Sequence, residues 1–263
     1  MRFKLHLLLG GDGLHSLPSN YQYELSTWIS KTLHFGSQPL LKLLKEKFYL
    51  DPYQQFCHYT FSPLQASEVT QHDDRMLIGD SRICLTLSTI SDADIRSHLM
   101  EVFTKIVGRV GDKKSKLEFV VDGVELLPEP VFSDVVTFSC LWPLVISDTS
   151  NPKKALYLSP EDKGFEKLFI KNLLAKYAWM MRNFPGKVNL VLPDLPALKF
   201  SIVSQPKGRV VKVRTDTPNP VSVKGYLFDF TLKAPAALVR AGYDLGFGES
   251  CNMGFGFCVP KQD

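Results

Sequence analysis

Near its C-terminal end the chain reads Gly242-Tyr-Asp-Leu-Gly246-Phe-Gly248-Glu-Ser-Cys-Asn252-Met-Gly254-Phe-Gly256-Phe-Cys258-Val-Pro260. Five of the fifteen residues from 242 to 256 are glycines, and aromatic residues stand between them. A glycine backbone can adopt positive φ and approach another group closely, because no Cβ stands in the way. Such a loop suits contact with phosphate, and tight packing of the backbone is the alternative explanation.

The order of elements around this loop argues against a dinucleotide-binding site. A helical pattern over 235–241 precedes the glycines, and a strand pattern over 254–259 follows them. In a Rossmann site the glycines follow a strand and open a helix. Working back along the chain, we expect a long strand from Val135 to Ser147, interrupted at Trp142-Pro143, and a helix that begins at Ser159-Pro160. Strands are expected over 188–192, 198–203, 209–214 and 222–232.

The first half of the chain has the same plan. Tyr21, Leu25, Trp28, Ile29 and Leu33 form a helical stripe, whereas Ile83, Leu85 and Leu87 alternate as in a strand. The expected order is strand 2–9, helix 21–33, strand 56–61, strand 83–88, helix 92–107 and strand 116–124, with a further short helix over 39–47 and a further short strand near 76–78. This βαββαβ order is typical of a ferredoxin-like unit. We therefore predict an α+β protein of two tandem ferredoxin-like domains, residues 1–128 and 129–263.

Composition favours an ordinary globular protein. With 263 residues and 44% hydrophobic content, the chain can bury one full core or two small ones. Its apolar runs are shorter than the ~20 residues that a membrane span needs. The five cysteines, at 57, 84, 140, 251 and 258, lack CxxC spacing and matching histidines. We expect a cytoplasmic protein that uses no metal and no cofactor and has no membrane partner.

Positive charge gathers in the second half. Residues 1–130 carry a net charge of −2 and residues 131–263 a net charge of +6. The sharpest basic feature is a predicted strand between two turns, which places Lys212 and Arg214 on one face and Arg209 on the other. We expect a protruding hairpin that binds phosphate through Lys207, Arg209, Lys212 and Arg214. An edge strand protected by its charges is the alternative.

The glycine-rich stretch resembles the C-terminal loop of the CRISPR-associated endoribonucleases of the RAMP superfamily, which cut the repeat transcript into guide RNAs. The resemblance extends in order over the whole chain. It is carried by Met1-Arg-Phe-Lys-Leu-His-Leu, Asn20-Tyr-Gln-Tyr-Glu-Leu-Ser-Thr-Trp-Ile, Phe61-Ser-Pro-Leu64, Val124-Glu-Leu-Leu-Pro-Glu-Pro130, Leu158-Ser-Pro-Glu-Asp162, and Asn172-Leu with Lys176-Tyr177.

The resemblance implies a metal-independent endoribonuclease whose partner is CRISPR repeat RNA. Cleavage would use the 2′-hydroxyl of the substrate as nucleophile and leave a 2′,3′-cyclic phosphate and a 5′-hydroxyl. It also implies that the basic hairpin and the glycine loop grip the RNA. For the loop, the RNA-binding residues would be Gly246, Gly248, Asn252, Gly254 and Gly256.

The catalytic residues of the similar family are not all kept. Lys45 stands where many relatives have a histidine, and Ser30 stands where a tyrosine is common. His34 follows Ser30 by one helical turn, and its ordinary pKa near 6.5 suits proton transfer at neutral pH. We predict a site of His34, Lys45 and Ser30, with a surface histidine at a helix end as the alternative.

Two classes of function stay open at this stage. The first is a repeat-specific endoribonuclease. The second is a catalytically silent relative that binds the repeat hairpin, or a RAMP subunit of a CRISPR effector complex. Other effector-complex subunits and a second copy of the chain are further candidate partners.

Overall fold

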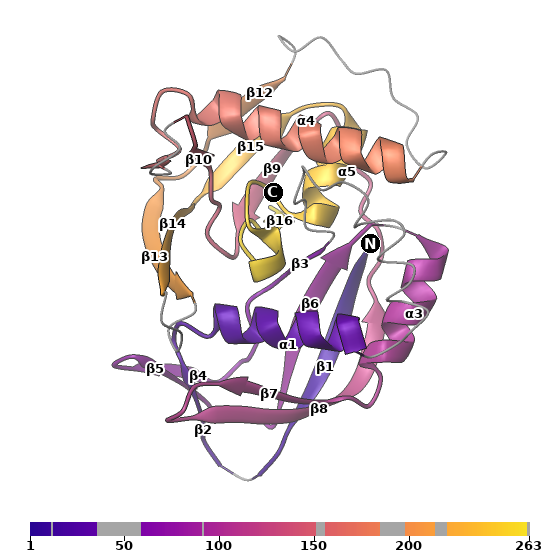
Figure 1. Ribbon diagram of the computed structural model, residues 1–263, viewed down its shortest axis with the longest axis vertical. Coiled ribbons are helices and arrows are strands. Elements are labelled where there is room, and N and C mark those ends of the chain that lie inside the picture. Colours follow the sequence, from indigo (N-terminus) through magenta and orange to yellow (C-terminus); the bar gives the residue numbers. More distant parts are fainter. Residues whose placement is uncertain are drawn as a thin grey trace.

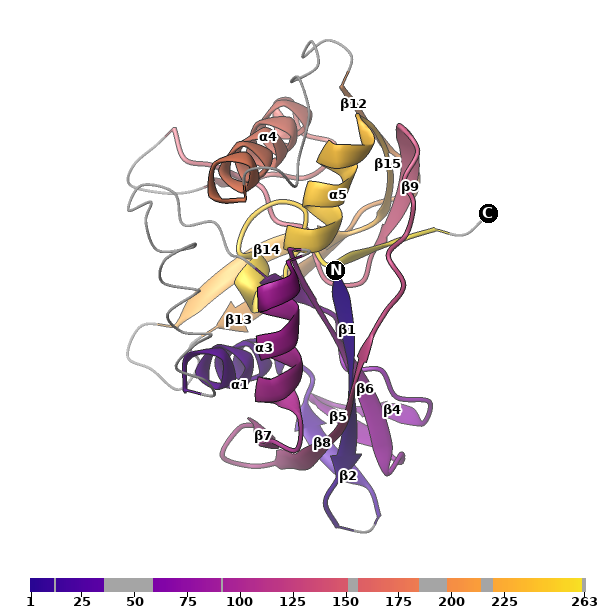
Figure 2. The same ribbon diagram turned by 90° about the vertical axis from the view of Figure 1, so that its right-hand side faces the viewer.

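The computed structural model describes residues 1–11, 13–35, 59–90, 92–150, 156–184, 198–213 and 220–261. Two units lie one above the other in Figure 1, with the N-terminal strands and helices below and the C-terminal ones above. In Figure 2 the helices of both units lie to the left of their sheets. The helix expected over 39–47 and the strand expected over 188–192 fall outside the described residues, and so do Lys45 and Arg214.

The N-terminal unit is built on a five-stranded antiparallel sheet in the order β3-β6-β1-β8-β7. Its main elements follow one another as strand, helix, strand, strand, helix, strand, with the first and third strands in the centre of the sheet. This is the ferredoxin-like arrangement that the sequence predicts. The elements are β1 (Arg2–Leu9), α1 (Gln22–Phe35), β3 (Tyr59–Phe61), β6 (Arg82–Thr89), α3 (Ala93–Phe103) and β8 (Lys116–Leu126), with β7 (Val107–Gly111) added at the edge.

Alternation along β1 explains why the helices cover one face of this sheet. Phe3, Leu5 and Leu7 are buried, while the residues between them reach toward the other face. Trp28 of α1 joins the two helices to the sheet. Its ring packs edge-on against Phe103 of α3 and Phe119 of β8, at centroid distances of 5.7 and 5.0 Å.

The C-terminal unit repeats the plan with a four-stranded sheet in the order β12-β15-β9-β16. Its elements are β9 (Val135–Cys140), α4 (Phe165–Asn183), β12 (Lys199–Ile202), β15 (Asp229–Lys233), α5 (Ala236–Leu245) and β16 (Cys258–Pro260). Phenylalanines fill the space between α4 and the sheet, with Phe169 stacked on Phe247 and Phe138 stacked on Phe230. The tandem ferredoxin-like fold is therefore confirmed, and the predicted boundary after residue 128 stays a prediction.

Two additions to these units matter for function. A separate hairpin, β13 (Lys207–Val213) with β14 (Val221–Leu227), is inserted between β12 and β15. In the N-terminal unit, β2 (His15–Pro18), β4 (Val69–His72) and β5 (Arg75–Ile78) form a small sheet of their own. The remaining short elements are β10 (Ser147–Asp148), β11 (Leu156–Tyr157) and the 3₁₀ turn η2 (Cys251–Met253).

Several predicted boundaries are wrong. The strand expected over 222–232 is divided at Phe228 into β14 and β15, which belong to different sheets. The strand expected over 135–147 ends as β9 at Cys140. The helix expected from Ser159 begins at Phe165, after Gly164 with φ of 97°. The Asp162 carboxylate instead accepts a hydrogen bond from the Ser159 amide and closes a separate turn.

The two units are joined by a buried arginine at the start of β1. The guanidinium of Arg2 donates to the carbonyls of Tyr243 (3.0 Å) and Cys258 (2.7 Å), and it stacks 3.5 Å from the Tyr243 ring centroid. Burial lowers the pKa of Arg2 to about 10. Beside it, the amino group of Met1 pairs with Asp244 at 2.8 Å. These contacts fasten β1 to the end of α5 and to β16.

Candidate functional site

The start of α1, the basic hairpin β13–β14 and the glycine loop, residues 246–256, meet at one place between the two units. Figure 1 shows α1 crossing the middle of the molecule with its first turn beside the hairpin. The Asn20 side chain donates to the Lys212 carbonyl, and the Gln22 side chain donates to the Met253 carbonyl at 2.6 Å. Side chains from the N-terminal unit thus hold both the hairpin and the loop.

The hairpin has an apolar inner face and a basic outer face. Val211, Val213 and Val223 pack inward with Val145 and Phe255 into a small core of their own. Lys212 lies between the two inward-facing valines of β13 and is exposed. The neighbouring strand presents Lys224 opposite Val210, also exposed, and Lys207 is exposed at the start of β13. The predicted hairpin is confirmed as the pair β13–β14, while its binding of phosphate stays a prediction.

Arg209 lies on the opposite face of β13 from Lys212, as the alternation predicts. Its guanidinium donates to the Ser19 carbonyl at 3.3 Å and lies 5.4 Å from the centroid of the Trp142 ring. Trp142 in turn packs edge-on against Tyr21. Arg209 is therefore engaged inside the junction, so the exposed lysines are the residues best placed for an external ligand.

The glycines of the loop are explained by close packing. Gly246, Gly248, Gly254 and Gly256 are all buried and all have positive φ. A Cβ on Gly256 would overlap the carbonyl of Phe247, so only glycine fits there. Asn252, by contrast, is exposed. Phosphate contact by the buried glycines stays a prediction, and of the five predicted loop residues Asn252 is the one whose side chain faces outward.

Sequence reasoning gave no role to two residues that hold this loop in place. The Glu249 carboxylate accepts hydrogen bonds from the Ser147 amide (2.9 Å) and hydroxyl (2.7 Å). The Lys176 ammonium of α4 is buried against the loop from the other side. Lys176 belongs to one of the motifs that carry the family resemblance, and its position within an apolar helical stripe, where a lysine is unexpected, is a second signal.

His34 and Ser30 lie together at the far end of α1. The half-buried His34 ring approaches the Ser30 carbonyl with Nδ1 at 2.7 Å, and because a carbonyl can only accept, Nδ1 is the donor in this contact. His34 and Ser30 are one turn apart, as predicted. Tyr23, which packs against the hairpin core, lies eleven positions before His34 on the same helix. At 1.5 Å per residue this places His34 about 16 Å along the helix from the hairpin.

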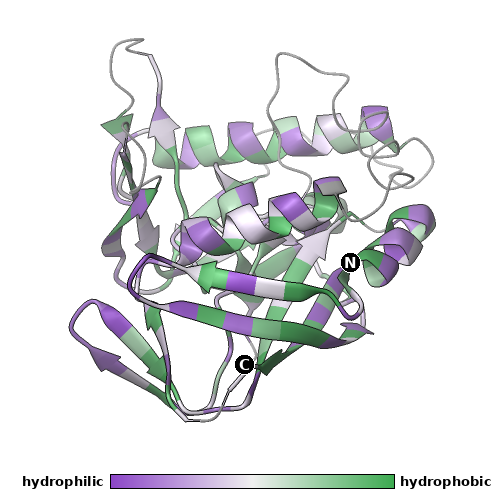
Figure 3. Cartoon of the chain, turned by 60° about the horizontal axis from the view of Figure 1, so that its bottom comes forward, coloured by the Kyte–Doolittle hydropathy of each residue, from purple (hydrophilic) through white to green (hydrophobic). Residues whose placement is uncertain are grey.

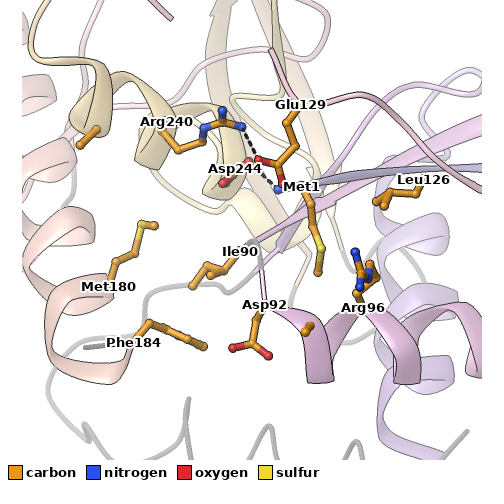
Figure 4. Close-up of a pocket in the computed structure, with 12 residues that line it drawn as sticks. Met1, Ile90, Asp92, Arg96, Leu126, Glu129, Met180, Phe184, Arg240 and Asp244 are labelled. Atoms are coloured by element: carbon orange, nitrogen blue, oxygen red, sulfur yellow. Dashed lines mark hydrogen bonds and ion pairs between the residues drawn. The ribbon is translucent and has the colours of Figure 1, made fainter. Parts of the chain in front are cut away.

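A cavity of about 480 Å³ lies elsewhere between the two units (Figure 4). Met1, Arg96, Met180, Phe184 and Arg240 are among its lining residues. Arg240 is paired with Glu129, at 3.4 Å. The predicted site residues are not among those that line it.

Within the described ranges, no three His, Cys, Asp or Glu side chains gather closely enough to hold a metal ion. None of the helices that the structure describes is both long and apolar enough to cross a membrane.

The chain matches a known protein family, and the fold and site described above are consistent with that match. The family model for the C-terminal part of the CRISPR-associated protein Cas6 matches residues 127–259. The chain belongs to the Cas6 family. This confirms the resemblance to the CRISPR-associated RAMP proteins that the sequence motifs indicate.

Relatives cover the whole length of this Cas6 chain. It is 26% identical to the CRISPR-associated endoribonuclease Cas6 1 of Methanocaldococcus jannaschii, over 99% of this chain and 93% of that protein. A structure from the characterisation of a Cas6-related gene of Pyrococcus furiosus superposes with a TM-score of 0.78 at 23% identity, covering 100% and 99% of the two chains. A RAMP protein described as binding different RNA substrates superposes with a TM-score of 0.77 at 23% identity, covering 100% of both chains. At these identities the superpositions support the fold.

Proposed function

We propose that this Cas6 protein binds CRISPR repeat RNA and cleaves it into guide RNAs without a metal ion. The observation that carries the proposal is family membership combined with the basic hairpin beside α1. The Methanocaldococcus jannaschii relative is named an endoribonuclease, and the RAMP structure is described as binding RNA. The net charge of +6 in residues 131–263 suits a partner with a phosphate backbone.

RNA binding is assigned to the exposed face of the hairpin and to the outer edge of the glycine loop. Lys207 and Lys212 are exposed ammonium groups on a strand that is held rigidly from behind by its valine core. Lys224 adds a third exposed charge on the neighbouring strand. Asn252 offers an amide that can donate to a phosphate or pair with a base edge. Arg209 supports this surface from inside the junction.

Cleavage is assigned to His34, with Lys45 as the group that stabilises charge on the phosphate. A base removes the proton of the 2′-hydroxyl, the 2′-oxygen attacks the adjacent phosphorus, and the 5′-oxygen leaves with a proton from an acid. Because the Nδ1 proton of His34 is held by the Ser30 carbonyl, Nε2 is the atom that accepts or returns the proton. Ser30 contributes through this carbonyl, which orients the ring.

The direct test is incubation of the purified protein with repeat RNA in excess EDTA. We expect cleavage at one position, with a 2′,3′-cyclic phosphate on the upstream product and a 5′-hydroxyl on the downstream product. A repeat with 2′-deoxyribose at the cleaved nucleotide is the matched control, and it should bind but stay intact. Activity that EDTA abolishes and a divalent ion restores, with the RNA fold shown to be intact, would contradict the metal-independent mechanism.

A second candidate function is binding of the repeat without cleavage. The observation that favours it is the presence of Ser30 and Lys45 where the similar family commonly has tyrosine and histidine. The same incubation separates the two candidates. Tight, specific binding of the repeat with no product under any metal condition would identify a silent RNA-binding relative or an effector-complex subunit.

A further inference from the structure

Lys176 occupies a buried position on α4 where the neighbouring positions of the same stripe are apolar. The inner stripe of α4 contains Phe169, Leu173, Lys176 and Met180, spaced three or four residues apart, and all four are buried. Figure 3 shows this helix at the top of the molecule with hydrophilic and hydrophobic residues alternating along it. The lysine side chain is only 2% exposed. Burying an ammonium group is costly unless all of its protons are bonded.

The glycine loop supplies partners for the three protons. Nζ of Lys176 donates to the Gly246 carbonyl at 2.5 Å, to the Gly248 carbonyl at 2.6 Å and to Cys251 Sγ at 3.1 Å. An ammonium group has three donors and no acceptor, so these contacts satisfy it fully. Among the described residues no carboxylate pairs with this ammonium. The loop itself therefore holds the charge.

The loop conformation and the lysine depend on each other. Gly246 and Gly248 have φ of 84° and 79°, values that favour glycine, and this backbone turns both carbonyls toward the same nitrogen. Without the ammonium, two carbonyls would converge in a buried place with no donor between them. That arrangement would be unfavourable, and the loop would relax to another conformation.

We infer that Lys176 is the positioning residue of the glycine loop, which fixes the conformation in which residues 249–253 face the RNA. The inference rests on the proposed function for its RNA readout only. Lys176 is not a catalytic residue, because its protons are all committed to the protein and its side chain is closed off from solvent. Its effect on RNA passes through the loop, where Asn252 is the exposed side chain.

The test compares Lys176→Met with Lys171→Met, which removes an exposed lysine from the same helix. Lys176→Met should speed amide hydrogen exchange in residues 246–253 by about tenfold or more, because local opening becomes easier, while the sheet strands keep wild-type exchange. Affinity for the repeat should fall by about tenfold or more as the loop is misplaced. Lys171→Met should change neither quantity.

Two further readouts separate positioning from other roles. Because Lys176 touches no phosphate, the slope of log affinity against log salt should stay at the wild-type value in Lys176→Met, whereas a lost phosphate contact changes it by about 0.7–0.9. At saturating RNA the single-turnover cleavage rate should stay within about threefold of wild type, because the proton-transfer group lies elsewhere. A changed slope would mean that Lys176 contacts the RNA directly and would overturn the inference.

The remaining outcomes also decide the question. Wild-type exchange and affinity in Lys176→Met would overturn the inference, and so would faster exchange with unchanged affinity. If the wild-type protein binds no repeat RNA, the proposed function fails, while exchange still decides whether Lys176 holds the loop. If Lys176→Met does not fold, Cys251→Ala takes its place, since it removes one of the three acceptors. That variant should show a smaller increase in exchange over the same residues, and wild-type exchange there would refute the role.

Discussion

The exposed lysines of the hairpin give the sharpest quantitative prediction. Replacing Lys207 and Lys212 with alanine removes two exposed charges from β13 and leaves the buried valines of the hairpin unchanged, so the hairpin should stay folded. Each lost phosphate contact reduces the salt slope of log affinity by about 0.7 for single-stranded and 0.9 for duplex contacts. The double variant should therefore lower the slope by about 1.4–1.8.

This change in slope has a direct consequence for measured affinities. Between 50 and 200 mM salt, the ratio of wild-type to variant affinity should shrink by about 7- to 12-fold, a value that follows from the same slopes. The assay is a titration of labelled repeat RNA at four or more salt concentrations. The control is a double variant of Lys167 and Lys171, two exposed lysines on α4, which loses the same net charge. Parallel salt plots for wild type and the hairpin variant would refute phosphate binding by these lysines and leave the edge-protection explanation.

Three further predictions test the proton-transfer group, the glycine packing and an ion pair. His34→Ala should lower the single-turnover rate by ~10² or more and leave RNA affinity nearly unchanged; a wild-type rate would refute the assignment. Gly256→Ala should lower the unfolding free energy in a denaturant titration by about 2 kcal/mol or more, because the added Cβ would meet a backbone carbonyl. Gly164→Ala, which adds a Cβ in open space, should lower it by only about 1 kcal/mol. Equal losses in the two variants would contradict the packing argument. The Arg75 guanidinium holds the pKa of the Asp112 carboxyl below its ordinary 3.8. The stability advantage of wild type over Asp112→Asn should therefore be present above pH 3.8 and shrink as the pH falls below that value. A difference in melting temperature that does not change with pH would count against the ion pair.

Much of the fold could be predicted because each domain core repeats a simple local pattern. Alternation in β1 and the helical stripe of α1 are readable without tertiary information, and the order of such elements already indicates two ferredoxin-like units. The alternation of β13 likewise placed Arg209 and Lys212 on opposite faces correctly. These successes share one cause: each element has one buried face and one face outside its local core, so the period of its side chains reports which face each residue occupies.

The errors occur where tertiary contacts overrule local signals. Ser159-Pro160 has the residues of a helix start. The Asp162 carboxylate accepts a hydrogen bond from the Ser159 amide in a separate turn instead, and the helix begins only at Phe165. The stretch 222–232 alternates polar and apolar residues along most of its length, as one strand would, but its two parts pair with different strands, which no local pattern can reveal. The strands β2 and β4 have only four residues each, and β4 is exposed throughout, so they give almost no hydrophobic period.

The sequence indicated which segments form the candidate site, but it did not indicate the contacts that several of their residues make. For the glycine loop, phosphate contact was expected and tight backbone packing was the alternative, but its contact with Lys176 was not predicted, because this lysine is about 70 residues away in sequence. The contacts of Asn20 and Gln22 with the hairpin and the loop were equally invisible, since they join the two domains. Periodicity describes one element at a time, and this site depends on how three elements meet.

The geometry of α1 connects the two halves of the proposed activity. Its first turn is tied to the hairpin through Asn20 and to the glycine loop through Gln22, and its last turn carries His34. An α-helix is a rigid spacer, so RNA held at the hairpin would meet the histidine at a fixed separation of about 16 Å along the helix. A fixed spacing selects one phosphate along the bound repeat, as a site-specific cleavage enzyme requires. Under the silent-binder alternative the same helix would still position the RNA, and only the proton transfer at His34 would be missing.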